Sequence, residues 1–80
     1  MSTPALTPAQ RALLVELAHV ADMRVTGARI GTARSLERLG LARSLATEEP
    51  LPNGRGELWS LVDAGHELAR TLDPSVPRRR

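Results

Sequence analysis

Four polar side chains lie within one short stretch of the chain and could together bind an anion. Arg34 and Arg38 stand four residues apart, which places both on one face of a helix, and Thr32 and Ser35 flank them. A guanidinium group is a planar fork that bonds bidentately to guanine edges and phosphates, so this pattern is compatible with a helix face that contacts bases or phosphates. The other interpretation is a solvated helix face on which an arginine pairs with Glu37 or another neighbour.

Two further arginines extend this candidate site. Arg29 precedes the stretch, and Arg55 stands at a glycine-flanked tip where it suits contact with a phosphate or the minor groove. Glutamates flank the tip on both sides, and they would repel DNA if they faced it. The predicted DNA-binding residues are Arg29, Thr32, Arg34, Ser35, Arg38 and Arg55.

Composition argues against several other function classes. The 80 residues include no cysteine and two histidines, which removes thiolate chemistry and leaves too few ligands for a typical zinc site. Trp59 is the only aromatic residue, so a base-stacking platform is not expected. Neither a catalytic constellation nor an apolar run of membrane length is present. We therefore expect a cytoplasmic protein that is not an enzyme and uses no cofactor or metal.

The basic residues are unusual in kind rather than in number. All eleven are arginine, and the net charge is only +2. Two causes could each explain why arginine is used and lysine is not: a GC-rich coding sequence, or a surface that binds nucleic acid. The charge is therefore compatible with DNA binding without establishing it.

The elements that must position these residues begin with a helix over about 8–22. Thr7 and Gln10 form a capping-box pattern around Pro8, which suits the first helical position. An apolar stripe follows at helical spacing, made of Leu13, Leu14, Leu17, Ala18 and Ala21. After it, residues 23–25 suit a short extended piece.

The segment before the candidate site is harder to interpret. In one straight helix over 27–39, Arg29 would lie on the side of Leu36 and Ile30 would face away. We therefore predict a short helix ending near Gly31, then a turn, then a second helix that starts at Thr32.

Glycine and proline positions mark the rest of the chain. Gly40 predicts the end of the second helix, and Leu41, Arg43 and Leu45 alternate onto one face of an extended segment. A long hairpin loop over 47–56 leads to a return strand over 57–62, in which Trp59 and Leu61 share a face. Asp63 is expected to cap a last helix over 64–72, with Leu68 and Leu72 pointing inward.

Two phrases in this order resemble those of MarR-like winged helix-turn-helix regulators. Ser35-Leu36-Glu37-Arg38-Leu39-Gly40-Leu41 is similar to the end of their recognition helix, and Leu58 to Ala69 resembles their return strand and the helix after it. The resemblance covers about residues 7–72. The sequence departs from the family pattern in three ways. Val62 stands where threonine is usual, and the first helix of the helix-turn-helix is about one turn short. The long terminal helices through which the family dimerises are absent.

The resemblance implies an α+β, mostly α, winged helix-turn-helix fold: three N-terminal helices, a two-stranded wing hairpin and a C-terminal helix. We expect a flexible N-terminus over 1–6, this domain over 7–72 and a disordered basic tail over 73–80. A recognition helix at about 32–39 would enter the major groove of double-stranded DNA, with a wing at about 46–57.

The function expected from this fold is that of a small transcriptional regulator. A phage or mobile-element origin would suit a stand-alone domain of this size. The alternative is a winged helix that binds another protein or works as a subunit of a larger assembly; the near-neutral charge and the acidic base of the wing favour it. A homodimer is compatible with either function.

Overall fold

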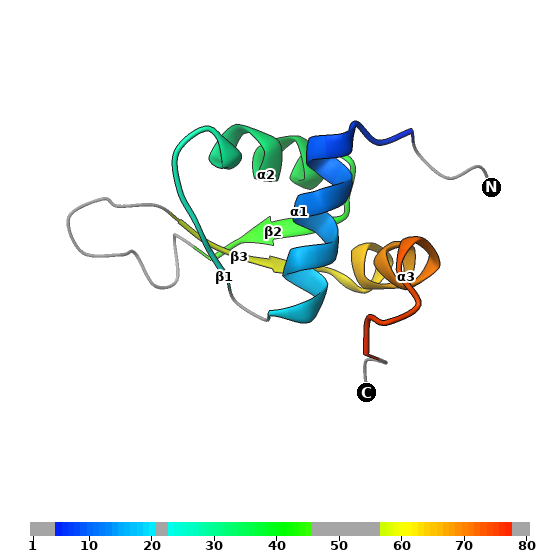
Figure 1. Cartoon of the computed structure of the whole chain (residues 1–80). Coiled ribbons are helices and arrows are strands. Elements are labelled where there is room, and N and C mark those ends of the chain that lie inside the picture. The colour runs from blue at the N-terminus through cyan, green and yellow to red at the C-terminus, as the bar shows by residue number, and fades with distance from the viewer. Residues whose placement is uncertain (1–4, 21–22, 46–56, 78–80) are drawn as a thin grey trace.

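Helices dominate the computed structural model, which describes residues 5–20, 23–45 and 57–77 (Figure 1). The described residues form three helices, α1 (Pro8–His19), α2 (Arg29–Arg38) and α3 (Asp63–Leu72). They also form three strands, β1 (Met23–Val25), β2 (Ala42–Ser44) and β3 (Glu57–Leu61). The expected small, mostly helical α+β architecture is therefore present.

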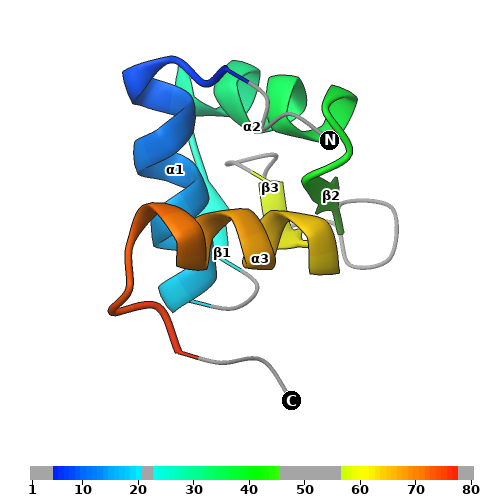
Figure 2. The same ribbon diagram turned by 90° about the vertical axis from the view of Figure 1, so that its right-hand side faces the viewer.

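The strands form one three-stranded antiparallel sheet in the order β1-β3-β2, rather than the expected two-stranded hairpin, because β1 pairs with the free edge of β3. Trp59 of β3 lies opposite Met23 of β1 and Ser44 of β2, so all three side chains share a face of the sheet. Helix α1 lies against this face, α2 runs along one side of the molecule, and α3 lies beyond the end of β3 (Figures 1 and 2).

The core lies between this face and the helices. Trp59 is 1% exposed and is the largest of the fully buried side chains, as the sequence predicts. The others are Leu13, Leu14, Leu36 and Val25, which come from α1, α2 and β1. The single aromatic residue thus joins the sheet to the helices.

Residues 5–20 and 23–45, the described part before the hairpin loop, contain two helices rather than the three that the sequence predicts. Helix α1 ends at His19 and not near residue 22, and α2 is one continuous helix from Arg29 to Arg38. The turn before α2 lies at Gly27, whose φ is 63°, whereas Gly31 lies inside the helix. The prediction of a break near Gly31 is therefore wrong.

The apolar residues of α2 explain why the helix does not break. Ile30, Ala33 and Leu36 follow one another three residues apart, and all three pack in the core or against it. Because α2 contacts α1 as well as β1 and β2, its buried stripe is wide enough to include Ile30. Tertiary packing thus outweighs the cost of about 1 kcal/mol for a glycine inside a helix.

Gly40 ends α2, as predicted. It has a φ of 76°, its N–H donates to the Glu37 carbonyl at 2.9 Å, and the Leu41 N–H donates to the Leu36 carbonyl at 3.0 Å. These two bonds define a Schellman motif, in which the left-handed residue lets the next amides satisfy free carbonyls of the last turn.

Beyond Gly40 the chain pairs into the predicted hairpin, but with a different buried face. Ala42 lies opposite Leu61 and both are buried, whereas Arg43 lies opposite Ser60 and is exposed. The predicted shared face of Leu41, Arg43 and Leu45 is wrong because strand β2 covers only 42–44 and its middle residue points away from the core. The predicted loop over 47–56 lies outside the described residues.

Helix α3 starts one residue earlier than predicted. Asp63 is the first helical residue and Val62 occupies the N-cap position without a side-chain hydrogen bond, so the predicted capping role of Asp63 is wrong. A carboxylate in the first turn still interacts favourably with the positive end of the helix dipole. Leu68 and Leu72 pack against the core, as predicted.

The domain continues past α3 to Pro77 rather than ending at Leu72. Val76 is 3% exposed and belongs to the core. The Nε2 atom of His66, a 9% exposed residue on α3, lies 2.7 Å from the Pro77 carbonyl oxygen. Residues 73–77, which the sequence assigns to a disordered tail, therefore pack against the body of the protein, and 78–80 lie outside the described residues.

Candidate nucleic-acid interface

The outward face of α2 presents two of the predicted arginines. Arg34 and Arg38 are exposed and lie one helical turn apart, while Ala33 and Leu36 on the opposite side are buried. Arg38 has no hydrogen-bond or ion-pair partner among the described residues. This face therefore offers one free guanidinium group and, beside it, a second one that is held in place.

Glu57 holds that second group. The Nη2 atom of Arg34 donates to Oε2 of Glu57 at 3.1 Å, and Oε1 of the same carboxylate accepts from the indole Nε1 of Trp59 at 3.1 Å. The Glu57 side chain is 23% exposed, against 62% for Arg34. One carboxylate thus connects α2, the start of β3 and the core.

Two of the other candidates near α2, Arg29 and Ser35, already have side-chain partners in the protein. Arg29, at the first helical position, pairs with Glu16 of α1. The Ser35 hydroxyl donates to the Thr32 carbonyl at 2.6 Å and accepts from Nε2 of Gln10 at 2.9 Å. Ser35 therefore joins α2 to α1 and has no free donor for a base edge.

Gln10 has a second role at the start of α1. Its Oε1 atom accepts from the Thr7 N–H at 2.9 Å, while its own N–H donates to the Thr7 hydroxyl at 3.1 Å. The predicted capping box is confirmed. The same side chain thus fixes the helix start and, through Ser35, the position of α2.

The remaining sequence-predicted residue, Arg55, lies outside the described residues. The structure adds two arginines that the site did not include. Arg24 lies opposite Leu58, and Arg43 lies opposite Ser60, so both point from the sheet surface away from the core. Both are exposed.

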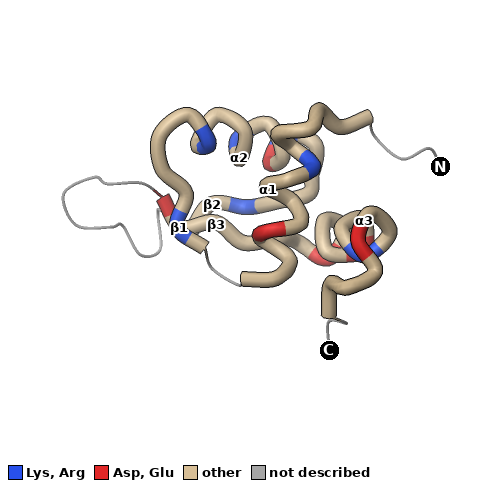
Figure 3. Tube along the Cα trace, viewed as in Figure 1, with Lys and Arg blue, Asp and Glu red and all other residues tan. Residues whose placement is uncertain are grey.

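Charge is unevenly distributed between the two halves of the described chain. Residues 5–20 and 23–45 carry six arginines against two glutamates, whereas 57–77 carry one arginine against four carboxylates. Figure 3 shows basic positions on α2, β1 and β2, at the other end of the molecule from α3. The modest net charge therefore hides a basic end around α2, β1 and β2, which also includes Glu57, and an acidic end at α3.

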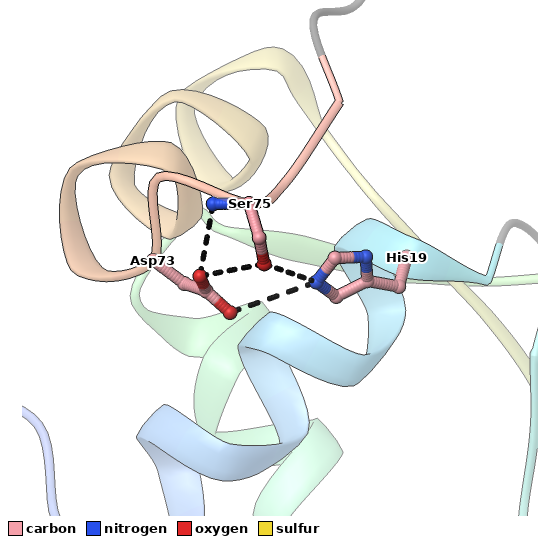
Figure 4. Close-up of polar contacts among 3 residues, drawn as sticks. All are labelled: His19, Asp73 and Ser75. Carbon is pink, nitrogen blue, oxygen red and sulfur yellow. Dashed lines mark hydrogen bonds and ion pairs between the residues drawn. The ribbon is translucent and has the colours of Figure 1, made fainter.

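A second polar cluster joins α1 to the segment after α3 (Figure 4). Nε2 of His19 lies 3.6 Å from Oδ2 of Asp73 and 3.5 Å from the Ser75 hydroxyl, which itself donates to Oδ1 of Asp73 at 2.7 Å. Hydrogen bonds from the Ser75 hydroxyl and N–H, and then the nearby His19, lower the pKa of Asp73. In a catalytic relay the histidine lies between serine and aspartate and uses both ring nitrogens, which is not the arrangement here.

The described ranges contain no group of three side chains that could hold a metal ion. Their helices are also too short or too polar to cross a membrane. In comparisons with known proteins, no family model, curated protein or solved structure matches the chain. Functional inference therefore depends on the geometry of this site.

The sequence identifies the exposed arginines of α2 but not the residues that orient them. In the sequence pattern Glu57 is only a charge near the wing, and Gln10 is only a capping residue. Glu16 and Glu57 lie 13 and 23 residues from their arginine partners. No local spacing rule links residues so far apart, so only the fold reveals these pairs.

Proposed function

We propose that the protein is a double-stranded DNA-binding domain of the winged-helix type that acts in transcriptional regulation. The observation that carries this proposal is the outward face of α2, where Arg34 and Arg38 are exposed one turn apart. In this proposal α2 enters the major groove, and the β2–β3 hairpin beside it acts as the wing.

The dimensions and chemistry of α2 support this. A helix with its side chains is about 10–12 Å in diameter, which fits a major groove about 12 Å wide, and the ten residues of α2 give it a length of about 15 Å. Arg38 is free to bond guanine or phosphate, and each good bidentate pair contributes about 1–3 kcal/mol of discrimination. The basic end of the molecule would release counterions from the DNA backbone.

Contact between the two family-like phrases also supports the proposal. Leu41 is the last residue of the first phrase, and its carbonyl accepts from the Val62 N–H at 3.1 Å. A Cβ atom added at Gly65 in the second phrase would lie 2.0 Å from the same oxygen. The two phrases therefore meet at one backbone contact, where only glycine fits.

Fluorescence anisotropy with a labelled random-sequence duplex at several salt concentrations tests the proposal. We expect salt-dependent binding, and Arg38→Ala should weaken it and reduce the log–log salt slope by about 0.9. Arg11→Ala is the matched control, because it removes the same charge from an exposed position on α1 that lines a groove next to Leu72. An absence of wild-type binding at low salt, or an equal effect of the two variants, would contradict the proposal.

A protein-interaction domain is the second candidate function. A groove of about 550 Å³ lies between the start of α1 and the end of α3. Its aliphatic lining is Leu6, Pro8, Ala12, Val15 and Leu72, and its charged lining is Arg11, Glu16 and Asp73. Light scattering over a concentration series tests the simplest case, a homodimer. A constant monomer mass would count against that case.

A further inference from the structure

The Arg34–Glu57 contact has a property that a plain surface ion pair lacks. Glu57 uses one oxygen for Arg34 and the other for the indole of Trp59, each at 3.1 Å. Trp59 is 1% exposed and sits in the middle strand of the sheet, so it cannot follow a moving carboxylate. Glu57 is thus anchored on its core side and holds the guanidinium from a fixed point.

An anion that binds Arg34 through the Nη2 donor competes with this carboxylate. Nη2 of Arg34 donates to Glu57, and a phosphate or a guanine edge that binds on that side of the guanidinium group needs the same donor. The Arg34 side chain is 62% exposed, so the pair is well solvated and its release is inexpensive. The contact is therefore strong enough to orient Arg34 and weak enough to be exchanged.

We propose that Glu57 is a positioning residue that orients Arg34 and competes with an anionic partner for it, so that DNA binding at α2 replaces the Arg34–Glu57 contact. This inference rests on the proposed function and adds to it an internal competitor. Weak polyanion contacts do not displace Glu57, whereas a well-placed phosphate or guanine does. Discrimination at Arg34 then depends on a residue that does not itself touch the DNA.

Glu57→Gln is the informative substitution. The glutamine carbonyl can still accept from Nε1 of Trp59, but its amide group then faces the Arg34 donors and cannot accept from them. The hairpin anchor is kept while Arg34 is released. Glu67→Gln is the matched control, since it removes the same charge from an exposed position on α3, at the far end of the molecule from α2.

The anisotropy titration is repeated with the wild type, both variants, Arg34→Ala and the Arg34→Ala/Glu57→Gln double variant. We expect Glu57→Gln to bind the random duplex about two- to fivefold more tightly, since an exposed ion pair is worth about that much. Its salt slope should match that of the wild type, because Arg34 contacts phosphate in both complexes and only the cost of displacing Glu57 differs. Glu67→Gln should bind as the wild type does, and the gain should vanish in the Arg34→Ala background.

The fluorescence of Trp59 provides an independent measurement, because Trp59 is the only tryptophan in the sequence. Addition of duplex to the wild type should change its emission as Arg34 leaves Glu57, and the change should be smaller in Arg34→Ala. Wild-type binding with no gain in Glu57→Gln, or a gain that survives in the Arg34→Ala background, overturns this inference and leaves the proposed function standing. A failure of both wild type and Glu57→Gln to bind duplex overturns both.

Discussion

Gly40, just after the end of α2, and Gly31, in the first turn of the same helix, give opposite expectations for the same substitution. Gly40 has a φ of 76°, where a Cβ atom is strained, so Gly40→Ala should lower the free energy of unfolding by about 1 kcal/mol. Gly31 lies inside the helix with open space where a Cβ atom would be added, so Gly31→Ala should raise it by about 0.5–1 kcal/mol. Urea denaturation of both variants measures the difference. Equal effects would argue against the left-handed helix end.

Single residues were predictable where their cause is local. The Thr7–Gln10 capping box and the stop at Gly40 each depend on residues within a few positions of one another, and both are confirmed. The partners of Arg29 and Arg34 were not predictable, because a salt bridge between distant residues follows from the packing of whole elements.

At the scale of elements, α3 approaches the chain after α2 more closely than a side chain would allow. A Cβ atom on Gly65 would lie 2.0 Å from the Leu41 carbonyl oxygen and 2.9 Å from its carbon, both backbone atoms. Gly65→Ala should therefore lower the free energy of unfolding by about 2 kcal/mol or more, since the helix must shift. Thermal and urea unfolding measure this. Ala64→Gly, at an exposed position of the same helix, should cost only about 1 kcal/mol.

The elements themselves were predictable to different degrees. Helix α1 follows from its capping box and its apolar periodicity, and the hairpin strands and α3 follow from periodicity and turn signals; their approximate positions were right. The sequence divides α2 in two because Ile30 does not align with Leu36 on an isolated helix. Contacts with α1 and the strands widen the buried stripe, and this effect is absent from the sequence pattern of α2 alone.

At the scale of the whole molecule, the segment after α3 closes the core on the side away from α2 (Figures 1 and 2). Val76 is 3% exposed, so Val76→Ala should lower the free energy of unfolding by about 1–3 kcal/mol through lost burial and an added cavity. Val20 is 53% exposed, so Val20→Ala should change the free energy of unfolding by no more than about 0.5 kcal/mol. Calorimetry on both variants measures the contrast. A small effect at Val76 would mean that the segment contributes little to folding.

This closure was not predictable because the segment looks like a tail. Prolines interrupt it and arginines follow it, a composition typical of chain ends without fixed structure. A single valine and the His66 contact with the Pro77 carbonyl are enough to hold it in place. The uneven charge was equally hidden, because only the fold separates basic from acidic residues in space.

The two outer strands of the sheet have a consequence for self-association. An unpaired strand edge is a template on which another chain can add, and long, flat, apolar edges lead to aggregation. Here β1 and β2 each have three residues, and an exposed arginine, Arg24 or Arg43, stands at the middle of each. A second molecule that approached either edge would find few backbone groups to pair with and a like charge opposite its own, so the sheet resists amyloid-like growth at high concentration.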